Sequence, residues 1–404
     1  MRPGWHATTL GDVCQLQSGA GFPTDYQGRS EGQYPFFKVS DMNLEGNEEA
    51  LIRANNYVSD DARRALGARV FPAGSVVFPK VGGAIATNKK RQAVQPSCVD
   101  NNIMGLVPKP ELIDPNFLFQ WMKGLDLYEL SNKANPPSIT QGTVASWPIV
   151  LPPLDEQKHI VAALDQAFAA LDRARAKVRE SLSDARLVFH AHVRELFSAG
   201  EGKAWSAAPL GDLADFRNGI NFTKASRGKE VRVLGVKDFK NHFHSPDTGL
   251  DRVTIDGDLD PGDCLQSGDI VFVRSNGNPE LIGRSLVIER MSEMTAHSGF
   301  TIRARLRDRK IVPSFLGHFL KSSAVRRQMV DGGTGTNIKS LNQGTLSRIL
   351  VPLPSRAEQI RIGENLEAVR EGTTHIEARY TEQLAAMAAL RQSLLQAAFS
   401  GQLS

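Results

Sequence analysis

The sequence predicts an α/β protein built as a tandem repeat: two globular domains joined by two long antiparallel helices, related by a pseudo-two-fold axis. Three observations predict this fold. The first half of the sequence resembles the second half, each half opens with short strand-like runs between turn residues, and each half closes with about 45 residues that contain no proline. A length of 404 residues, of which 41% are hydrophobic and 23% charged, suits about two to four globular domains.

Composition excludes some classes of protein and leaves the partner open. The net charge is +4 and the pI is near 8.9, which permits a polyanionic partner without requiring one. Cys14, Cys98 and Cys264 are too far apart for a disulfide framework or paired metal ligands, so we expect buried free thiols. No stretch approaches the ~18 consecutive apolar residues of a membrane helix, and no apolar leader opens the chain. We therefore expect a cytoplasmic protein without a membrane segment.

The internal repeat depends on matches that occur in the same order in both halves. Seven identities recur at an offset of 200: Trp5, Ala7, Leu10, Gly11, Asp12, Gly19 and Phe22 with Trp205, Ala207, Leu210, Gly211, Asp212, Gly219 and Phe222. The stretch 142–157 matches 344–359 at an offset of 202, and the run 76–80 matches 270–274 at an offset of 194. One unit therefore occurs twice. The segments between these matches diverge, either by drift and insertion or because each copy carries its own recognition surface.

Each globule is predicted to be mixed α/β. Short apolar runs bounded by Gly, Pro, Asn and Asp indicate strands at 36–39, 75–78, 231–236, 269–273 and 285–288. Segments 117–124 and 315–321 are predicted to be helical, each entered through a proline, Pro115 or Pro313. Neither globule has the βαβ rhythm of a nucleotide-binding domain.

A proline-rich hinge ends each globule, at Pro152-Pro153 and at Pro352-Leu353-Pro354, and a long helix follows it. The predicted boundaries are a first globule at 1–153, a helix at 154–200, a second globule at 201–354 and a helix at 355–404. Apolar residues recur at spacings of three and four: Ile160, Leu164, Ala167, Leu171, Ala174, Val178, Leu182, Ala185 and Val188, then Ile362, Leu366, Val369, Thr373, Ile376, Tyr380, Leu384, Met387 and Leu390. Such a stripe predicts that the helices pair with each other as a coiled coil.

No arrangement of residues predicts an active site. The segment 333–340 resembles a phosphate-binding loop but lacks the glycine before Lys339 and the strand-then-helix context. His242 and His244 lie near Asp247 at a spacing that a metal site could use, but a solvated loop is the simpler interpretation. His192 is expected to be a helix-seam histidine satisfied by a neighbour.

Polar and basic side chains are concentrated in the turn-rich segments of both globules. Arg and Lys can neutralise phosphates and read guanine, and Asn can pair with adenine through two hydrogen bonds. The candidate DNA contacts are Lys80, Asn88, Lys89, Lys90, Arg91, Asn101 and Asn102 in the first globule, and Arg217, Asn218, Lys237, Lys240, Arg274, Asn276, Asn278, Arg284, Asn337 and Lys339 in the second. Solvation of the loops alone would also account for many of these residues.

The order of these elements resembles the specificity (S) subunit of type I restriction/modification systems. In that family a domain opens with Trp and Leu-Gly-Asp, closes with a Pro-Leu-Pro and Glu-Gln stretch, continues into a long helix, and is duplicated. The corresponding residues here are Trp5, Leu10 to Asp12 and Leu151 to Gln157, repeated as Trp205, Leu210 to Asp212 and Val351 to Gln359. The ending Ser393 to Leu403 is also similar to the terminal helix of the family.

The resemblance implies a non-catalytic DNA-binding subunit. Its target-recognition domains, 1–153 and 201–354, would each read one half of a bipartite site on double-stranded DNA, and the helices would act as spacers. It also implies two methyltransferase subunits that use S-adenosylmethionine and motor/nuclease subunits that use ATP and magnesium, with no cofactor or metal in this chain. Two alternatives stay open: a specificity module of another phage-defence methyltransferase system, and a coiled-coil scaffold that binds proteins. A self-contained enzyme lacks the necessary residues.

Overall fold

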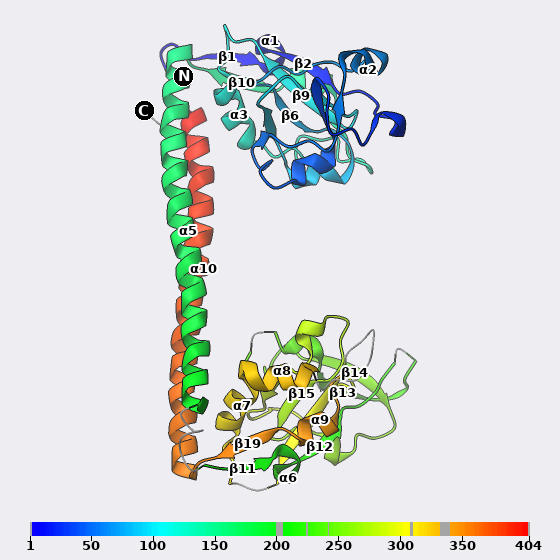
Figure 1. Ribbon diagram of the computed structural model, residues 1–404, viewed down its shortest axis with the longest axis vertical. Coiled ribbons are helices and arrows are strands. Elements are labelled where there is room, and N and C mark those ends of the chain that lie inside the picture. Colours follow the sequence, from blue (N-terminus) through cyan, green and yellow to red (C-terminus); the bar gives the residue numbers. More distant parts are fainter. Residues whose placement is uncertain are drawn as a thin grey trace. The chain divides into compact units, whose positions relative to one another are not determined.

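The computed structural model of the protein describes residues 2–198, 205–223, 225–240, 242–307, 310–331 and 340–402. The chain divides into two compact units: unit 1 is Met1–Val178 with Glu382–Ser404, and unit 2 is Arg179–Thr381. Each unit contains an α/β globule and a part of each long helix, α5 (Leu154–Ser198) and α10 (Arg356–Phe399) (Figure 1). The predicted α/β class and the two long helices are confirmed.

Unit 1 is built on three antiparallel or mixed sheets. A two-stranded sheet joins β1 (His6–Thr9) to β10 (Pro148–Leu151). The five-stranded sheet has the order β2 (Cys14–Ser18), β9 (Ile103–Pro108), β6 (Val76–Pro79), β7 (Arg91–Ala93) and β4 (Ala50–Leu51). The three-stranded sheet has the order β5 (Tyr57–Val58), β3 (Tyr34–Phe37) and β8 (Cys98–Val99). The α-helices of this globule are α1 (Leu10–Val13), α2 (Asp60–Ala65), α3 (Pro115–Lys123) and α4 (Gln141–Ala145).

Unit 2 repeats this plan. A two-stranded sheet joins β11 (Ser206–Pro209) to β19 (Leu350–Leu353). The four-stranded sheet has the order β12 (Ala214–Asn218), β18 (Thr301–Leu306), β15 (Ile270–Val273) and β16 (Ser285–Val287). The three-stranded sheet has the order β14 (Asp251–Asp256), β13 (Gly228–Leu234) and β17 (Thr295–His297). The α-helices are α6 (Leu210–Leu213), α7 (Pro313–Lys321), α8 (Ser323–Asp331) and α9 (Gln343–Ser347).

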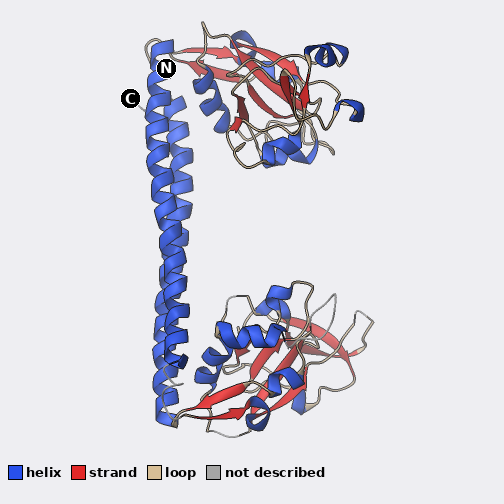
Figure 2. Cartoon of the chain, in the orientation of Figure 1, coloured by secondary structure: helices blue, strands red, loops and turns tan. Residues whose placement is uncertain are grey.

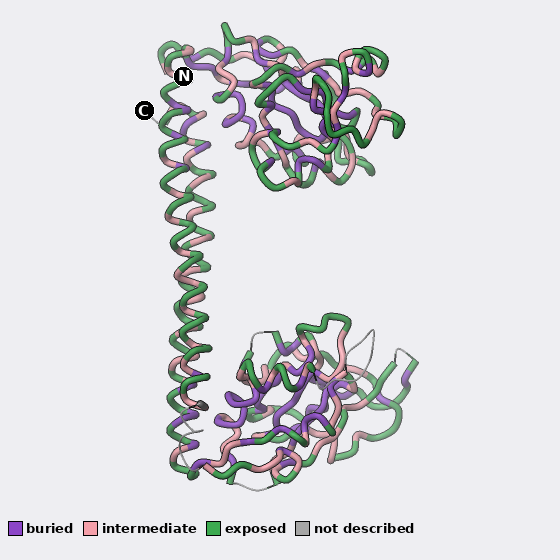
Figure 3. Tube along the Cα trace, viewed as in Figure 1, coloured by how far each residue is buried: buried purple, intermediate pink, exposed green. Residues whose placement is uncertain are grey.

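The two predicted short helices are confirmed as α3 and α7, and each begins at its proline. Strands β6 and β15 are buried along their whole length, and short helices lie around the sheets of each globule (Figure 2). Buried residues follow the same interior strands (Figure 3). Cys14 and Cys98 are buried free thiols as expected, whereas Cys264 is half-exposed because it follows a turn at the globule surface.

One glycine of the repeat is required by a close approach between two segments of backbone. A Cβ added at Gly19 would lie 2.0 Å from the carbonyl oxygen of Asp100, and one at Gly219 would lie 2.2 Å from that of His297. Backbone hydrogen bonds hold these segments together in both units: Gly19 N donates to Ile103 O, and Gly219 N donates to Thr301 O. This contact explains why the glycine recurs at an offset of 200.

Gly19→Ala and Gly219→Ala are each expected to destabilise their own unit by about 3 kcal/mol, because the backbone must move apart to admit the methyl group. Thermal unfolding followed by hydrogen exchange of peptides from each unit measures the effect. Gly21→Ala is the matched control, since a Cβ at that position meets nothing within 4 Å. Equal stability of the Gly19 and Gly21 variants would contradict this interpretation.

The long helices pack antiparallel within each unit, as predicted. In unit 1, Arg391 of α10 lies 3.3 Å from Asp172 of α5. In unit 2, Arg186 of α5 lies 2.8 Å from Glu377 of α10. His192 hydrogen-bonds to Asn365 at 2.7 Å, which confirms the prediction that a neighbour satisfies it.

The predicted apolar stripe is wrong at three positions. Val188, Ile376 and Leu390 are exposed, with 63%, 42% and 49% of their surface open. At each of these three places the next residue along the helix, Phe189, Glu377 or Arg391, is partly buried and lies on the seam instead. Because Glu377 and Arg391 are polar, a pattern of hydrophobic residues does not identify these two seam positions.

The core of unit 1 includes the end of α10. Leu395 and Ala398 are buried in one cluster with Trp5, Phe117 and Leu164. The ring of Phe399 meets that of Phe117 edge-on at 5.2 Å between centroids. The first globule therefore packs against side chains from the last helix of the chain.

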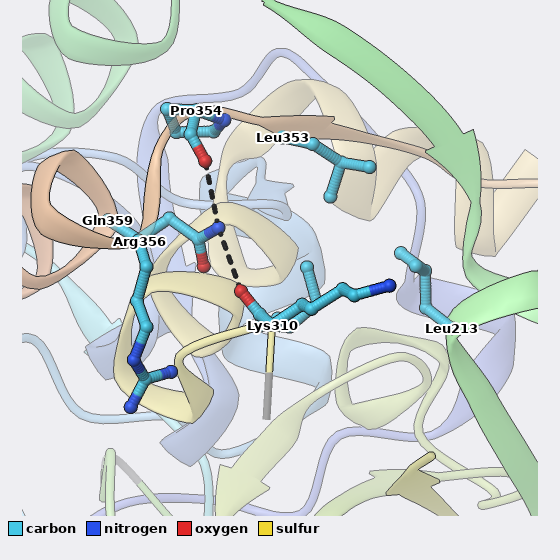
Figure 4. A pocket seen from close by; sticks show the side chains of 7 residues that line it. Leu213, Lys310, Leu353, Pro354, Arg356 and Gln359 are labelled. Carbon is cyan, nitrogen blue, oxygen red and sulfur yellow. Dashed lines mark hydrogen bonds between the residues drawn. The ribbon is translucent and has the colours of Figure 1, made fainter. Parts of the chain in front are cut away.

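A buried glutamine fixes each globule to its helix. Gln157 accepts a hydrogen bond from Asp114 N at 2.8 Å and donates to the carbonyls of Leu112 and Pro152. Gln359 repeats these contacts. It accepts from Val312 N at 2.9 Å. It also donates to the carbonyls of Lys310 and Pro354 (Figure 4). A carboxamide is the side chain that can accept and donate in this way. The glutamine of the repeated Glu-Gln match therefore has a structural role: it connects each globule to its long helix.

Candidate nucleic-acid interface

Polar side chains gather where three strands of unit 1 begin or end. Lys80 follows β6, Ser18 ends β2, and Asn101 and Asn102 precede β9. Lys80 Nζ donates to Ser18 Oγ at 3.0 Å, and Gln141 Nε2 from the start of α4 donates to the same oxygen at 3.0 Å. Asn101 and Asn102 are exposed. These five residues form what we call the strand-end cluster of unit 1.

Unit 2 has the same cluster with different side chains. Arg274 follows β15, Asn218 ends β12, and Phe300 precedes β18. Gln343 Nε2 from the start of α9 donates to Asn218 Oδ1 at 3.1 Å. The guanidinium of Arg274 donates a hydrogen bond to Gly299 O at 3.4 Å. Arg274, Asn218, Phe300 and Gln343 form the strand-end cluster of unit 2.

The two clusters share one backbone scheme. Lys80 N donates to Asn102 O at 2.8 Å, and Lys80 O accepts from Ile139 N at 2.9 Å. Arg274 N donates to Phe300 O at 2.8 Å, and Arg274 O accepts from Leu341 N at 2.9 Å. The scaffold is therefore the same in both units, while the side chains that it presents differ.

The other candidates of the first globule brace a loop. Lys90 and Arg91 are buried, and the guanidinium of Arg91 donates to the carbonyls of Lys90 and Met42 at 2.8 and 3.0 Å. Burial lowers the pKa of Lys90 to about 8. Asn88 has a φ of +54° and accepts hydrogen bonds from Lys90 Nζ and Leu127 N, and Lys89 contacts Asn43. In this conformation Lys90 and Arg91 present no head group to a ligand.

The remaining candidates of the second globule differ in accessibility. Arg217 is paired with Asp260 and Asp263, and Lys237 is paired with Asp251. The side chains of Asn276 and Asn278 accept from backbone N–H groups of their own turn. Lys240 is exposed, and Arg284 donates to its carbonyl at 2.7 Å. Asn337 and Lys339 lie outside the described residues.

Sequence reasoning missed four members of the clusters: Ser18, Gln141, Gln343 and Phe300. The two glutamines stand directly before the matched stretches 142–157 and 344–359, so their identity at an offset of 202 was the available signal. Phe300 is 62% exposed, which is unusual for a phenylalanine beside a basic residue. Ser18 carries no signal in the sequence, because its role depends on contacts with Lys80 and Gln141.

The metal-like histidine spacing serves packing. His244 does not lie in a solvated loop: its ring nitrogens lie 3.3 Å from Glu289 and 3.2 Å from Glu367 of α10. Asp247 pairs with Arg232 at 2.6 Å. Among the described residues no cluster of His, Cys, Asp and Glu has the arrangement of a metal site. Within the same residues, every helix is too short or too polar to traverse a bilayer.

The fold and the clusters define a class of protein: a duplicated recognition chain in which two homologous α/β units each present one polar strand-end cluster. The family model for the type I restriction modification DNA specificity domain matches residues 3–180 and again residues 203–386. The chain belongs to this family, and it is a specificity subunit, the component that carries no catalytic activity.

Curated relatives are similar over most of their length. The chain is 24% identical to the StySPI specificity subunit of Salmonella potsdam, covering 83% of this chain and 76% of that protein. It is 24% identical to the EcoKI specificity subunit of Escherichia coli K12 over the same shares. These values describe a distant relationship that spans both units.

Solved structures share the fold. A chain of a type I R-M system, solved to explain complex assembly and conformational transition, matches with a TM-score of 0.77 at 18% identity, covering 100% of this chain and 99% of that one. The HsdS subunit from Thermoanaerobacter tengcongensis matches with a TM-score of 0.58 at 19% identity, covering 100% and 98%.

Proposed function

We propose that each unit reads one half of a bipartite site on double-stranded DNA through its strand-end cluster. The observation that supports this most directly is the repetition of one scaffold with different side chains. Unit 1 presents Lys80 with two asparagines, and unit 2 presents Arg274 with Phe300 and Asn218. Two readers of the same protein recognise different bases when their contacting side chains differ.

The chemistry of the clusters suits base edges in a groove. Lys and Arg donate to guanine, Asn and Gln can pair with adenine, and an exposed Phe can contact the thymine methyl group. Gln141 and Gln343 each use one amide hydrogen within the cluster, which holds the side chain in place and leaves the second available. Preorganised donors of this kind support sequence reading better than mobile loop lysines.

We also propose that the paired helices set the gap between the half-sites and dock two methyltransferase subunits. Val188 and Leu390 are equivalent in the repeat, and both are exposed apolar side chains on the outer faces of their helices. Leu187 beside Val188 is also 62% exposed. Equivalent apolar positions in the two copies suit two copies of one partner. S-adenosylmethionine would then act in the methyltransferase subunits, and ATP and magnesium in the motor/nuclease subunits.

Charge reversal tests the readers separately. Lys80→Glu is expected to abolish methylation or relax the sequence of one half-site, and Arg274→Glu to do so for the other, because each loses a donor and places an anion against DNA. The measurement is a map of methylated adenines in DNA from cells that carry the intact system.

Lys158→Glu, on the exposed side of α5, is the control for overall charge, since its side chain is 64% exposed and outside both clusters. If Lys80→Glu and Arg274→Glu change the same half-site, or if both behave like Lys158→Glu, the assignment of one reader to each unit is wrong. Purified with the methyltransferase, a protein-binding scaffold would protect no DNA, whereas the proposed reader protects two short blocks.

A further inference from the structure

Unit 2 contains a cavity of about 450 Å³ that the proposed reading of DNA does not use. Its walls come from α5, α7, α8 and α10, from the loop after β13, and from the turn before β16. The size is that of a small-molecule site. Aromatic rings of Phe239 and Phe243 form part of the wall.

The lining is strongly cationic. Six basic side chains line it: Arg186, Lys240, Arg284, Lys321, Arg326 and Arg370. Glu377 is the one carboxylate among the lining residues, and it pairs with Arg186 at 2.8 Å, while Arg370 pairs with Glu367 behind the wall. In the described part of the chain, no carboxylate lies within ion-pair distance of the other four.

Three of the four unpaired cations donate hydrogen bonds to neutral acceptors. Arg284 donates to Lys240 O at 2.7 Å, Lys321 donates to His242 O at 2.8 Å, and Arg326 donates to Glu280 O. Carbonyl oxygens orient these head groups but do not cancel their charge. Burial and the neighbouring arginines, Arg370 first among them, lower the pKa of Lys321 to about 7.

One polar atom of the lining residues is also without a hydrogen bond. Ser285 Oγ is buried, on a residue that is 3% exposed, and it has no hydrogen-bond partner in the described structure. The buried ring of His318 differs, because its Nε2 lies 3.3 Å from the carboxylate of Glu367. Buried polar groups without partners are uncommon, and they indicate a ligand or ordered water.

At the equivalent position of unit 1, the cationic side chains are paired with carboxylates. Lys123 occupies the position of Lys321 in the repeated helix, and its Nζ lies 2.9 Å from Glu49. Phe168 occupies the position of Arg370. The nearby cation Arg391 lies 3.3 Å from both Glu49 and Asp172. The charge excess is therefore a property of unit 2 and not of the shared scaffold.

We propose that the cavity of unit 2 is a phosphate-binding site, in which a phosphate group carried by DNA or by a free ligand supplies the negative charge that Lys240, Arg284, Lys321 and Arg326 lack. Guanidinium and ammonium groups are the side chains that bind phosphate best. The site is separate from the strand-end clusters, so it stands whether or not they read bases.

The test uses the full chain and its Lys321→Met variant. In chloride buffer at pH 6.5 and constant ionic strength, pyrophosphate is expected to bind the wild-type chain with a stoichiometry of one by calorimetry and to raise its unfolding temperature. Lys321→Met is expected to weaken this binding at least tenfold, while unfolding at an unchanged or higher temperature without pyrophosphate, because it removes a repelled charge. Arg326→Gln is a second variant with the same expected loss.

Lys123→Met in unit 1 is the matched control and is expected to bind pyrophosphate as the wild type does. A random-sequence duplex distinguishes the sources: if pyrophosphate weakens duplex binding by the wild type but not by Lys321→Met, the site holds a DNA phosphate, and if duplex binding is unaffected, it holds a free ligand. Equal pyrophosphate binding by all three variants, or a wild type that responds no more to pyrophosphate than to chloride, would overturn the proposal. Methylation maps report on the readers independently.

Discussion

Gln359→Glu is expected to destabilise unit 2 by about 3–5 kcal/mol, because it places an uncompensated carboxylate in a buried joint. The side chain of Gln359 is 2% exposed and donates to two carbonyl oxygens at 3.0 and 3.1 Å. A carboxylate cannot donate, so the same geometry would hold it against two oxygen atoms. For a unit of about 200 residues this corresponds to roughly 10 °C in unfolding temperature.

The pH dependence identifies the cause. Burial between carbonyl groups would raise the pKa of the new carboxyl above its unfolded value of about 4.3, so the variant regains stability as the pH falls and the group is protonated. The defect should therefore be larger at pH 8 than at pH 5. Gln359→Leu, which leaves the partners unpaired without adding a charge, should show a smaller defect that does not vary with pH.

Two controls complete this experiment. Gln157→Glu is expected to cause the same loss in unit 1, where Gln157 makes the same three contacts. Gln383→Glu makes the same chemical change on the exposed face of α10 and should be neutral. Hydrogen exchange of peptides from each unit assigns the loss, and a Gln359→Glu chain as stable as Gln383→Glu would show that the joint contributes nothing.

The second large effect is expected from lengthening both helices together. The ion pairs Arg391–Asp172 and Arg186–Glu377 fix one antiparallel register, in which Ala386 lies opposite Lys177. We expect repeats of residues 171–177 after Lys177 and of residues 380–386 after Ala386 to add one heptad to each helix and keep the seam. Each insertion lengthens its helix by about 10.5 Å, which is close to three base pairs of DNA.

Under the proposed function, the methylated half-sequences should stay the same while the gap between them grows by about three base pairs. The insertion in α5 alone is the control, since it moves Arg186 out of register with Glu377 and is expected to lower stability. A map of methylated adenines decides the matter. Changed half-sequences with an unchanged gap would show that the helices do not set the spacing.

The sequence was informative wherever both copies keep a residue for the same reason. Gly19 and Gly219 recur because a backbone lies against them, and Gln157 and Gln359 recur because a joint needs one acceptor and two donors. Such positions appear as identities at a fixed offset. The duplicated fold and the antiparallel pairing of the helices follow from them and from the periodic stripe.

The parts that sequence reasoning missed depend on contacts between distant segments. Gln141 meets Ser18 across more than a hundred residues, and nothing local in the sequence reports it. Lys90 and Arg91 were predicted to contact DNA because they are basic residues in a turn-rich segment. Their head groups are buried against backbone carbonyls instead. The apolar stripe failed at Val188 because Phe189 continues the seam one residue later.

The packing of Leu395, Ala398 and Phe399 against the first globule has a consequence for synthesis on the ribosome. The first globule emerges early, yet it lacks these side chains until the second globule and most of α10 have been made. During that interval Trp5 and Phe117 lack some of the side chains that bury them in the folded protein, so the hydrophobic core of the first globule is incomplete. Newly made protein is therefore expected to need chaperone protection of its first half, and truncation of the final helical turns should harm the domain that was made first.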